Sequence, residues 1–263
     1  MAFDKRKYRQ AALLLTGLCS SMAFSAIQPT NSFSLKPTPN FLSTLPAAIK
    51  HGHAVLQLGG YWSIAGVKQH INIDDLIGDE FTVTQNGSSN GLVGIGYFID
   101  GQETERFKMA YGINAFYLPK TSVSGTVIQE DTYTNLAYRY RLTQYPIYVV
   151  AKSIIKTNWS HYDATLDVGI GPNFMHAQGF NESTLGANTV PDAIFSSHTT
   201  TTFTATMGAG IKINHLFGEA PLECGYRFFY LGQGHFNAAT SQVLNNLSTG
   251  SVYGNAVMCS ISL

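Results

Sequence analysis

Residues 253–263 alternate between two kinds of side chain up to the carboxyl end of the chain. A period of two indicates a β-strand with two different faces. One face is small or polar, and the other is apolar apart from Asn255. The apolar face holds Tyr253, Val257, Cys259, Ile261 and Leu263. Terminal residues usually fray, so a strand at this position is typical of a chain whose last strand closes a barrel.

The first 25 residues have the features of a secretory signal peptide. Four basic residues precede the apolar stretch 11–18, which is too short to span a bilayer. The small residues Ala23 and Ser25 stand directly before the predicted cleavage site. We therefore expect an exported chain. Its expected parts are a signal peptide (1–25), a Pro-rich periplasmic lead (26–51) and an outer-membrane β-barrel (52–263).

The composition favours a membrane barrel over a soluble domain. Asp, Glu, Lys and Arg together make up 12% of the chain, about half of the roughly 25% that is usual for soluble globular proteins. Aromatic residues also make up 12%. The chain has a formal net charge of zero, which argues against a nucleic-acid partner.

Alternation with a period of two recurs along the rest of the chain. The predicted strands are 53–64, 92–100, 106–118, 133–156, 162–174, 203–213, 222–236 and 253–263. Apolar side chains on one face and Gly or polar side chains on the other are typical of a transmembrane barrel. A soluble β-sandwich gives the same alternation with the meaning of the faces reversed. The signal peptide, the low charge and the last strand favour the barrel.

The number of strands depends on residues 133–156, which Pro146 interrupts. Bacterial single-chain barrels have even strand numbers, so we expect one long strand with a bulge at Pro146 and eight antiparallel strands in total. The turns at 101–105, 157–160 and 215–221 are short and are assigned to the periplasmic side. The long connections 177–198 and 238–249 are assigned to the outer surface.

Charged residues on the polar face are expected inside the barrel, because a charge cannot face lipid without a large cost. This set comprises Lys152, Asp167, Lys212, Glu223 and Arg227. They could form a plug of ion pairs, or a gate or solute site in a conducting pore. Side chains almost fill an eight-stranded barrel, which favours the plug.

Cys224 and Cys259 are the two cysteines beyond the signal peptide, and they fall on strands joined by the last loop. Position 224 is expected opposite a residue near 260. Export permits a disulfide between them, but two separate lipid-facing thiols are an equally good interpretation.

Aromatic residues gather near the strand ends, where barrels carry girdles at the membrane surface. The predicted girdle comprises Trp62, Tyr117, Trp159, Tyr162, Phe174, Phe236 and Tyr253.

The sequence contains no catalytic, metal or cofactor signature. The Gly-x-Gly pairs lack the third glycine and the strand-to-helix context of a nucleotide site. His51 and His53 form only a weak His-x-His pattern. Ser197 and His198 are adjacent, but a catalytic triad needs groups that converge in space. We expect no catalytic residues, no metal and no cofactor.

The signal peptide and the segments TLDVGIGPNF, TATMGAGIKI, ECGYRFFYLGQG and VYGNAVMCSISL resemble the small outer-membrane barrels of Gram-negative bacteria, the OmpA-like, OmpX-like and OmpW-like group. The final residue departs from the group, being Leu263 where an aromatic residue is usual. The resemblance implies a monomeric, non-enzymatic protein with a structural or surface-interaction role.

The partners that the resemblance implies are outer-membrane lipid, lipopolysaccharide and the assembly machinery, with the partner of the surface loops unknown. Alternatives are a porin-like narrow channel for small apolar or weakly polar solutes, a lipid-modifying barrel enzyme and a soluble periplasmic β-domain.

Overall fold

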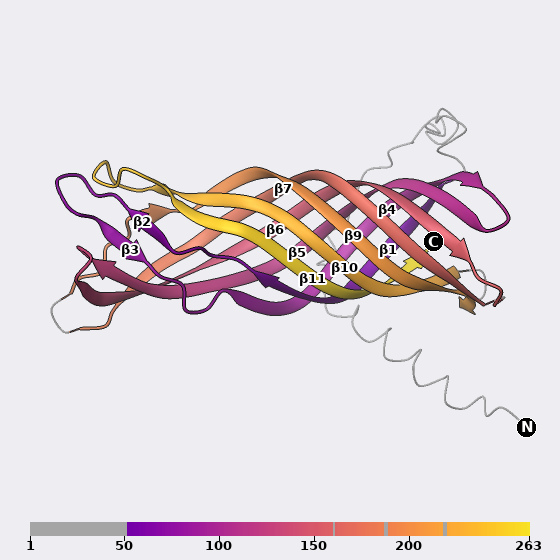
Figure 1. Ribbon diagram of the computed structural model, residues 1–263, viewed down its shortest axis with the longest axis horizontal. Helices are drawn as coiled ribbons and strands as arrows, with labels where there is room; N and C mark the ends of the chain where they lie inside the picture. Colours follow the sequence, from indigo (N-terminus) through magenta and orange to yellow (C-terminus); the bar gives the residue numbers. More distant parts are fainter. Residues whose placement is uncertain (1–51, 160, 187–188, 218–219) are drawn as a thin grey trace, which may run out of the picture. The chain divides into compact units, whose positions relative to one another are not determined.

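The computed structural model describes residues 52–159, 161–186, 189–217 and 220–263. The predicted signal peptide and lead lie outside these residues. The described chain forms antiparallel strands (Figure 1). They are β1 (Gly52–Ile64), β2 (Gln69–Ile71), β3 (Asp79–Phe81), β4 (Gly87–Glu103), β5 (Phe107–Gln129), β6 (Tyr133–Lys156), β7 (Tyr162–Thr184), β8 (Phe195–Ser196), β9 (His198–Phe217), β10 (Ala220–Ala238) and β11 (Leu247–Ser262). Among the described residues, no helix is long and apolar enough to cross a membrane.

Eight long strands close into a ring in the order β1, β4, β5, β6, β7, β9, β10 and β11. The ring closes because the first strand pairs with the last, from Val55 opposite Ser262 to Ile64 opposite Tyr253. This closure satisfies both edges that an open sheet would leave unpaired. The predicted eight-stranded antiparallel barrel, with its last strand closing the ring, is confirmed.

Residues 133–156 form a single strand, β6, as the strand count required. The predicted bulge at Pro146 is wrong. Pro146 lies opposite Asn173 in an unbroken register with β7, and the irregularity on this side lies between Arg139 and Arg141. Proline removes one backbone donor, yet β6 keeps its register with β7 from Arg141 to Lys156 despite that loss.

The strands are longer than the sequence predicted. A tilted strand crosses a bilayer in about 9–11 residues, whereas β5, β6 and β7 have 23, 24 and 23 residues. Much of the long connection predicted at 177–198 is therefore strand, since β7 runs to Thr184 and β9 begins at His198. The barrel continues well beyond one bilayer thickness at the end that carries the long loops (Figure 1).

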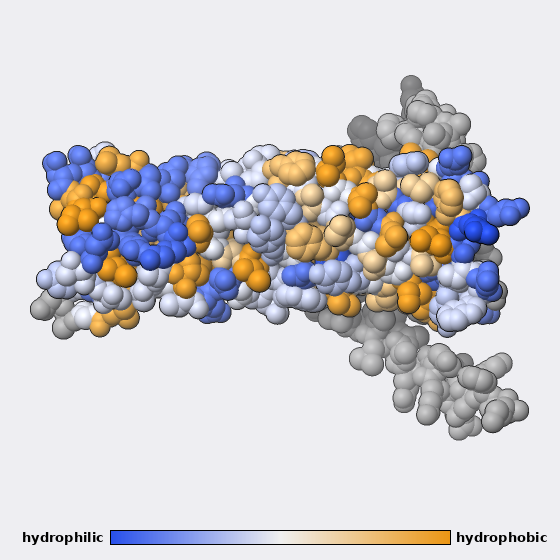
Figure 2. All heavy atoms as spheres, viewed as in Figure 1, coloured by the Kyte–Doolittle hydropathy of each residue, from blue (hydrophilic) through white to orange (hydrophobic). Residues whose placement is uncertain are grey.

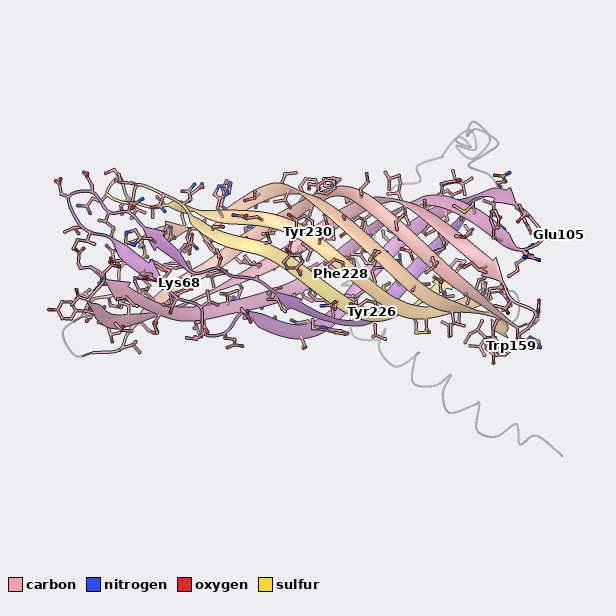
Figure 3. All side chains as sticks on the ribbon, in the orientation of Figure 1. Lys68, Glu105, Trp159, Tyr226, Phe228 and Tyr230 are labelled. Atoms are coloured by element: carbon pink, nitrogen blue, oxygen red, sulfur yellow. A yellow bond between two sulfur atoms is a disulfide. The ribbon has the colours of Figure 1, made fainter. Side chains whose placement is uncertain are left out.

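An apolar belt surrounds the half of the barrel nearer the short turns. Figure 2 shows apolar residues gathered on this half and a more hydrophilic surface on the other half. On β10, Tyr226, Phe228 and Tyr230 mark the outward face (Figure 3). The exposed apolar residues of the belt include Leu58, Ile95, Ile113, Val149, Leu166, Val168, Ile170, Met207, Ile211 and Val257. A closed barrel with this belt is built to span a bilayer. We call this half the membrane section.

The rest of the barrel, here called the outer extension, comprises the described residues of 65–86, 118–144, 175–202 and 231–252. Its faces are reversed, with polar side chains outside and an apolar core inside. The buried apolar residues include Ile71, Phe81, Leu118, Val123, Val127, Leu136, Tyr138, Tyr140, Leu142, Met175, Phe195, Leu231, Phe236, Leu247 and Val252. This arrangement is expected for a barrel surrounded by water, because burying apolar side chains inside removes them from water.

Register shifts allow one alternating sequence to serve both environments. An extra residue in a strand moves every later side chain to the opposite face. On β10 the shift lies between Tyr230, which faces outward, and Gly232, which has a φ of +80° that favours glycine. A similar shift lies beside Gly179 on β7, where φ is +64°. Another on β5 lies between Leu118 and Thr121. These three strands thus change faces where the surroundings change from lipid to water, whereas on β6 the exposed residues stay odd-numbered from Val149 to Arg139.

Candidate functional site

The interior of the membrane section contains two ion pairs. Arg227 and Asp167 face each other with two nitrogen–oxygen distances of 2.8 Å, and both residues are buried. Lys152 Nζ donates to Glu223 Oε2 at 2.8 Å, and Thr165 Oγ1 donates to Glu223 Oε1 at 2.8 Å. Four of the five predicted interior charges thus lie together in pairs across the lumen.

Lys212 does not join these pairs. It lies opposite Glu223 on β10 and Asp163 on β7, and none of the ion pairs in the described chain includes it. Lys212 instead lines a cavity of about 270 Å³ at the end of the barrel that holds the short turns, together with Lys108 and Asp100. The cavity at the level of Asp167 and Arg227 is only about 20 Å³.

Aromatic rings close the lumen above the ion pairs. Arg227 lies over the ring of Phe116, 5.6 Å from its centroid. Phe116 contacts Phe229 edge to face at 5.4 Å, and Tyr148 lies 6.1 Å from Phe116. Tyr148 also hydrogen-bonds Thr204 Oγ1 at 2.9 Å. Pairs of this kind prefer such tilted contacts, and together they form a second filled layer.

The apolar core of the outer extension forms a third filled layer. Phe81 lies 5.0 Å from Tyr138 and 5.9 Å from Phe195. Phe236 lies 5.0 Å from Tyr140. This layer could not be predicted from the sequence, because the alternation gives no direct sign of which segments leave the membrane. Gly179 and Gly232 were the available signal, since glycine in a strand often marks a bulge.

The predicted aromatic girdle is partly placed at the membrane edges. Exposed aromatic side chains mark the end with the short turns at Trp159 and Tyr162, and Figure 3 shows Trp159 at the same end as Glu105. At the opposite edge of the belt lie the exposed Trp62, Tyr117, Phe174 and Tyr253.

Phe236 was wrongly assigned to the girdle. Its side chain is fully buried in the outer extension, because the shift at Gly232 moves the later even-numbered residues of β10 inward. Tyr145 was missed: it is exposed beside Tyr117, with ring centroids 5.5 Å apart.

Cys224 and Cys259 lie directly opposite each other on β10 and β11, and the structure joins them as a disulfide. The sequence placed position 224 opposite a residue near 260, one position away from the observed partner. The bond links β10 to β11, the strand that closes the ring.

The candidate catalytic pair does not converge on an acid. His198 stacks on His235, with ring centroids 4.6 Å apart, and its Nδ1 lies 3.1 Å from Asn237 Nδ2. Within the described ranges, no ion pair includes His198, and no cluster of His, Cys, Asp and Glu has the arrangement of a metal site. His53 is described, whereas His51 lies outside the described residues.

Two buried carboxylates lie beneath the outer loops. Glu182 and Asp79 line a cavity of about 140 Å³ together with Asp192 and Gln242. Burial raises the pKa of Glu182 to about 7, opposed by the backbone N–H of Asp192 and reinforced by the charge of Asp79. Burial also raises the pKa of Asp79. Neither residue stands out in the sequence pattern.

We expect Glu182→Gln to stabilise this end of the barrel at alkaline pH. A raised pKa means that the folded state holds the proton more tightly than the unfolded chain does. The stability contributed by this group is therefore full below about pH 4.5, the usual value, and is lost as the pH rises to about 7. The amide of the substituted side chain would stay neutral throughout this window.

Protection of the backbone amides of Asp192 and Ile194 against hydrogen exchange measures this effect, because these two N–H groups donate to Glu182 Oε2 and to the carbonyl of Asp192. The variant should be better protected than wild type at pH 8, and the two should match at pH 4. Glu105→Gln, at the opposite end of the barrel (Figure 3), is the matched control and should show no difference. Equal protection of wild type and Glu182→Gln at pH 8 would contradict the expectation.

No protein-family model matches this chain, and no curated protein matches its sequence. Solved structures do match in fold. Neisserial surface protein A is 11% identical, with 80% of this chain and 96% of that chain covered and a TM-score of 0.41. The outer membrane protein OprG from Pseudomonas aeruginosa is 12% identical, with 81% and 96% covered and a TM-score of 0.46. The outer membrane protease OmpT from Escherichia coli is 7% identical, with 84% and 98% covered and a TM-score of 0.42. The resemblance to small outer-membrane barrels that the sequence suggested agrees with the closed eight-stranded ring of this chain.

Proposed function

We propose that this protein is a non-enzymatic outer-membrane barrel that conducts no solute and holds a rigid, water-facing extension at the cell surface. The observation that carries the proposal is the filled interior. Ion pairs, an aromatic layer and an apolar core follow one another along the lumen. Side chains of this kind convert an eight-stranded barrel into a packed solid.

The outer extension supports a role at the surface. Its strands continue the ring of the membrane section, so its loops are carried on paired strands instead of flexible connections. Loops held on a rigid scaffold are well suited to binding. We propose that a partner outside the cell, of a kind not yet known, contacts these loops. We also propose that the protein acts as a monomer and is inserted by the outer-membrane assembly machinery.

The absence of enzymatic activity is part of this proposal. Ser197 and His198 are adjacent in the sequence, but His198 forms no ion pair in the described chain, and its side chain contacts His235 and Asn237. A hydrolase of the Ser–His–acid class needs a third group that orients the histidine.

We expect planar bilayers containing the refolded protein to show no stepwise conductance. Proteoliposomes should likewise not swell in small sugars or amino acids. Refolding is first verified by a gel on which the unboiled barrel migrates differently from the boiled chain, and an open porin in the same bilayers serves as the positive control. Reproducible single-channel steps from folded protein would overturn the closed barrel and support the narrow channel instead.

A further inference from the structure

The outer extension carries a group of cations without acidic partners. Arg139 and Arg141 are exposed at alternate outward positions of β6, and Lys120 is exposed on the neighbouring β5. None of the ion pairs in the described chain includes these three residues. By contrast, Lys108 and Lys156 at the other end of the barrel each pair with a carboxylate. Cations without acidic partners on a chain of low charge density create a local positive potential, which attracts anions.

The two arginines border a groove of about 660 Å³. Ser122 and Ser124 face them across the β5–β6 ladder, with Ser122 opposite Arg141 and Ser124 opposite Arg139. Gln85 and Asn181 also line the groove and add amide groups. Arginine binds phosphate through two parallel donors, and hydroxyl and amide side chains suit the neutral groups of a sugar. A groove of this size is too large for a single small ion.

Gly179 makes room for one of the arginines. A Cβ added at this position would lie 3.0 Å from Arg141 Nη2. The register shift beside Gly179 therefore has a second consequence besides the change of faces. It lets the guanidinium of Arg141 lie across β7 at the side of the groove.

The groove lies a short way above the membrane edge. Tyr117 and Tyr145 mark that edge on the same two strands. Arg141 and Arg139 precede Tyr145 along β6 by four and six residues. At about 3.4 Å per residue and a tilt of about 40°, they lie roughly 10 to 16 Å above the aromatic pair. This height exceeds the 5 to 8 Å or so of a phospholipid headgroup layer but is within reach of a lipid with a phosphorylated sugar headgroup.

We propose that Arg139 and Arg141 form a binding site for the phosphorylated sugar headgroup of an outer-leaflet glycolipid, lipopolysaccharide. The aromatic pair below them would contact its acyl chains. This inference rests on the proposed outer-membrane placement, but not on whether the lumen is closed. A conducting barrel would leave the site intact, and a failed site would leave the filled lumen unchanged.

The test measures binding of purified lipopolysaccharide to the folded barrel in zwitterionic detergent micelles. The variant is Arg139→Ala combined with Arg141→Ala, and Arg106→Ala, an exposed cation at the opposite end, is the matched control. Loss of charge-assisted hydrogen bonds should weaken binding by at least about tenfold. The control should bind as wild type does. Because all three arginines are exposed, the unboiled gel shift should be unchanged in every variant.

Two further arms identify the ligand. Enzymatically dephosphorylated lipopolysaccharide should bind wild type at least about tenfold more weakly than the intact lipid, if phosphate is the group recognised. Inorganic phosphate and a soluble sulfated polysaccharide should compete poorly, because neither supplies acyl chains to the aromatic pair. Three results would overturn the proposal: unchanged binding by the double variant, unchanged binding of the dephosphorylated lipid, or equally tight binding of the soluble polysaccharide.

Discussion

Replacing Asp167 with alanine should destabilise the folded barrel by about 3–5 kcal/mol, because it leaves the charge of Arg227 buried without its partner. Both residues are buried, and the two nitrogen–oxygen distances between them are 2.8 Å. The other side-chain hydrogen bond of Arg227 is weak, since Thr206 Oγ1 accepts it from Nη1 at 3.4 Å, and the carboxylate of Glu223 is already paired with Lys152. Neither the neutral hydroxyl of Thr206 nor a carboxylate paired elsewhere can replace Asp167 beside the guanidinium.

The effect can be measured by urea-induced unfolding of the barrel in lipid vesicles. Fluorescence of Trp62 and Trp159, the two tryptophans of the chain, follows the membrane section in which both lie. The control variant combines Asp167→Leu with Arg227→Met, which removes both charges and fills a similar volume. We expect the double variant to lie within about 1 kcal/mol of wild type or to exceed it. A single variant as stable as wild type would show that this pair does not hold the lumen closed.

The architecture of the membrane section could largely be predicted from the sequence. The period-two alternation ending at Leu263 predicted a closing strand, and β11 pairs with β1. The parity of Asp167 and Arg227 predicted that both charges face inward, since neither could face lipid. These predictions succeeded because one rule, apolar toward lipid and polar toward the lumen, held along the whole section.

The outer extension was not predicted, because the same rule reverses there. Val123 and Val127 have the same odd parity on β5 as the lipid-facing Ile113, yet both are buried inside. The shift between Leu118 and Thr121 separates the two groups. A shift of one residue leaves the alternation visible in the sequence while exchanging its faces. The groove beside Arg141 was missed for a different reason. On β6 the exposed residues from Val149 to Arg139 are all odd-numbered, and the sequence does not show where along them the surroundings change from lipid to water.

Phe236 gives the sharpest test of this reversal. As a girdle residue it would face lipid, and truncation would cost little. In the structure its ring is fully buried and packs against Tyr140 at 5.0 Å and Phe180 at 6.1 Å. We therefore expect Phe236→Ala to lower the stability of the outer extension by about 3–5 kcal/mol, the usual cost of emptying a buried aromatic site.

Hydrogen exchange at the backbone amides of β10 and β11 beyond Gly232 reports this loss, because it reads the extension separately from the membrane section. Phe174→Ala is the matched control, since Phe174 is exposed on the lipid-facing side of β7. It should leave those amides as well protected as in wild type, whereas Phe236→Ala should speed their exchange by at least about a hundredfold, the factor that corresponds to roughly 3 kcal/mol. Equal protection in the two variants would mean that Phe236 faces outward and that the shift at Gly232 does not turn the strand. The outer extension would then lack the apolar core that makes it a rigid support for surface loops.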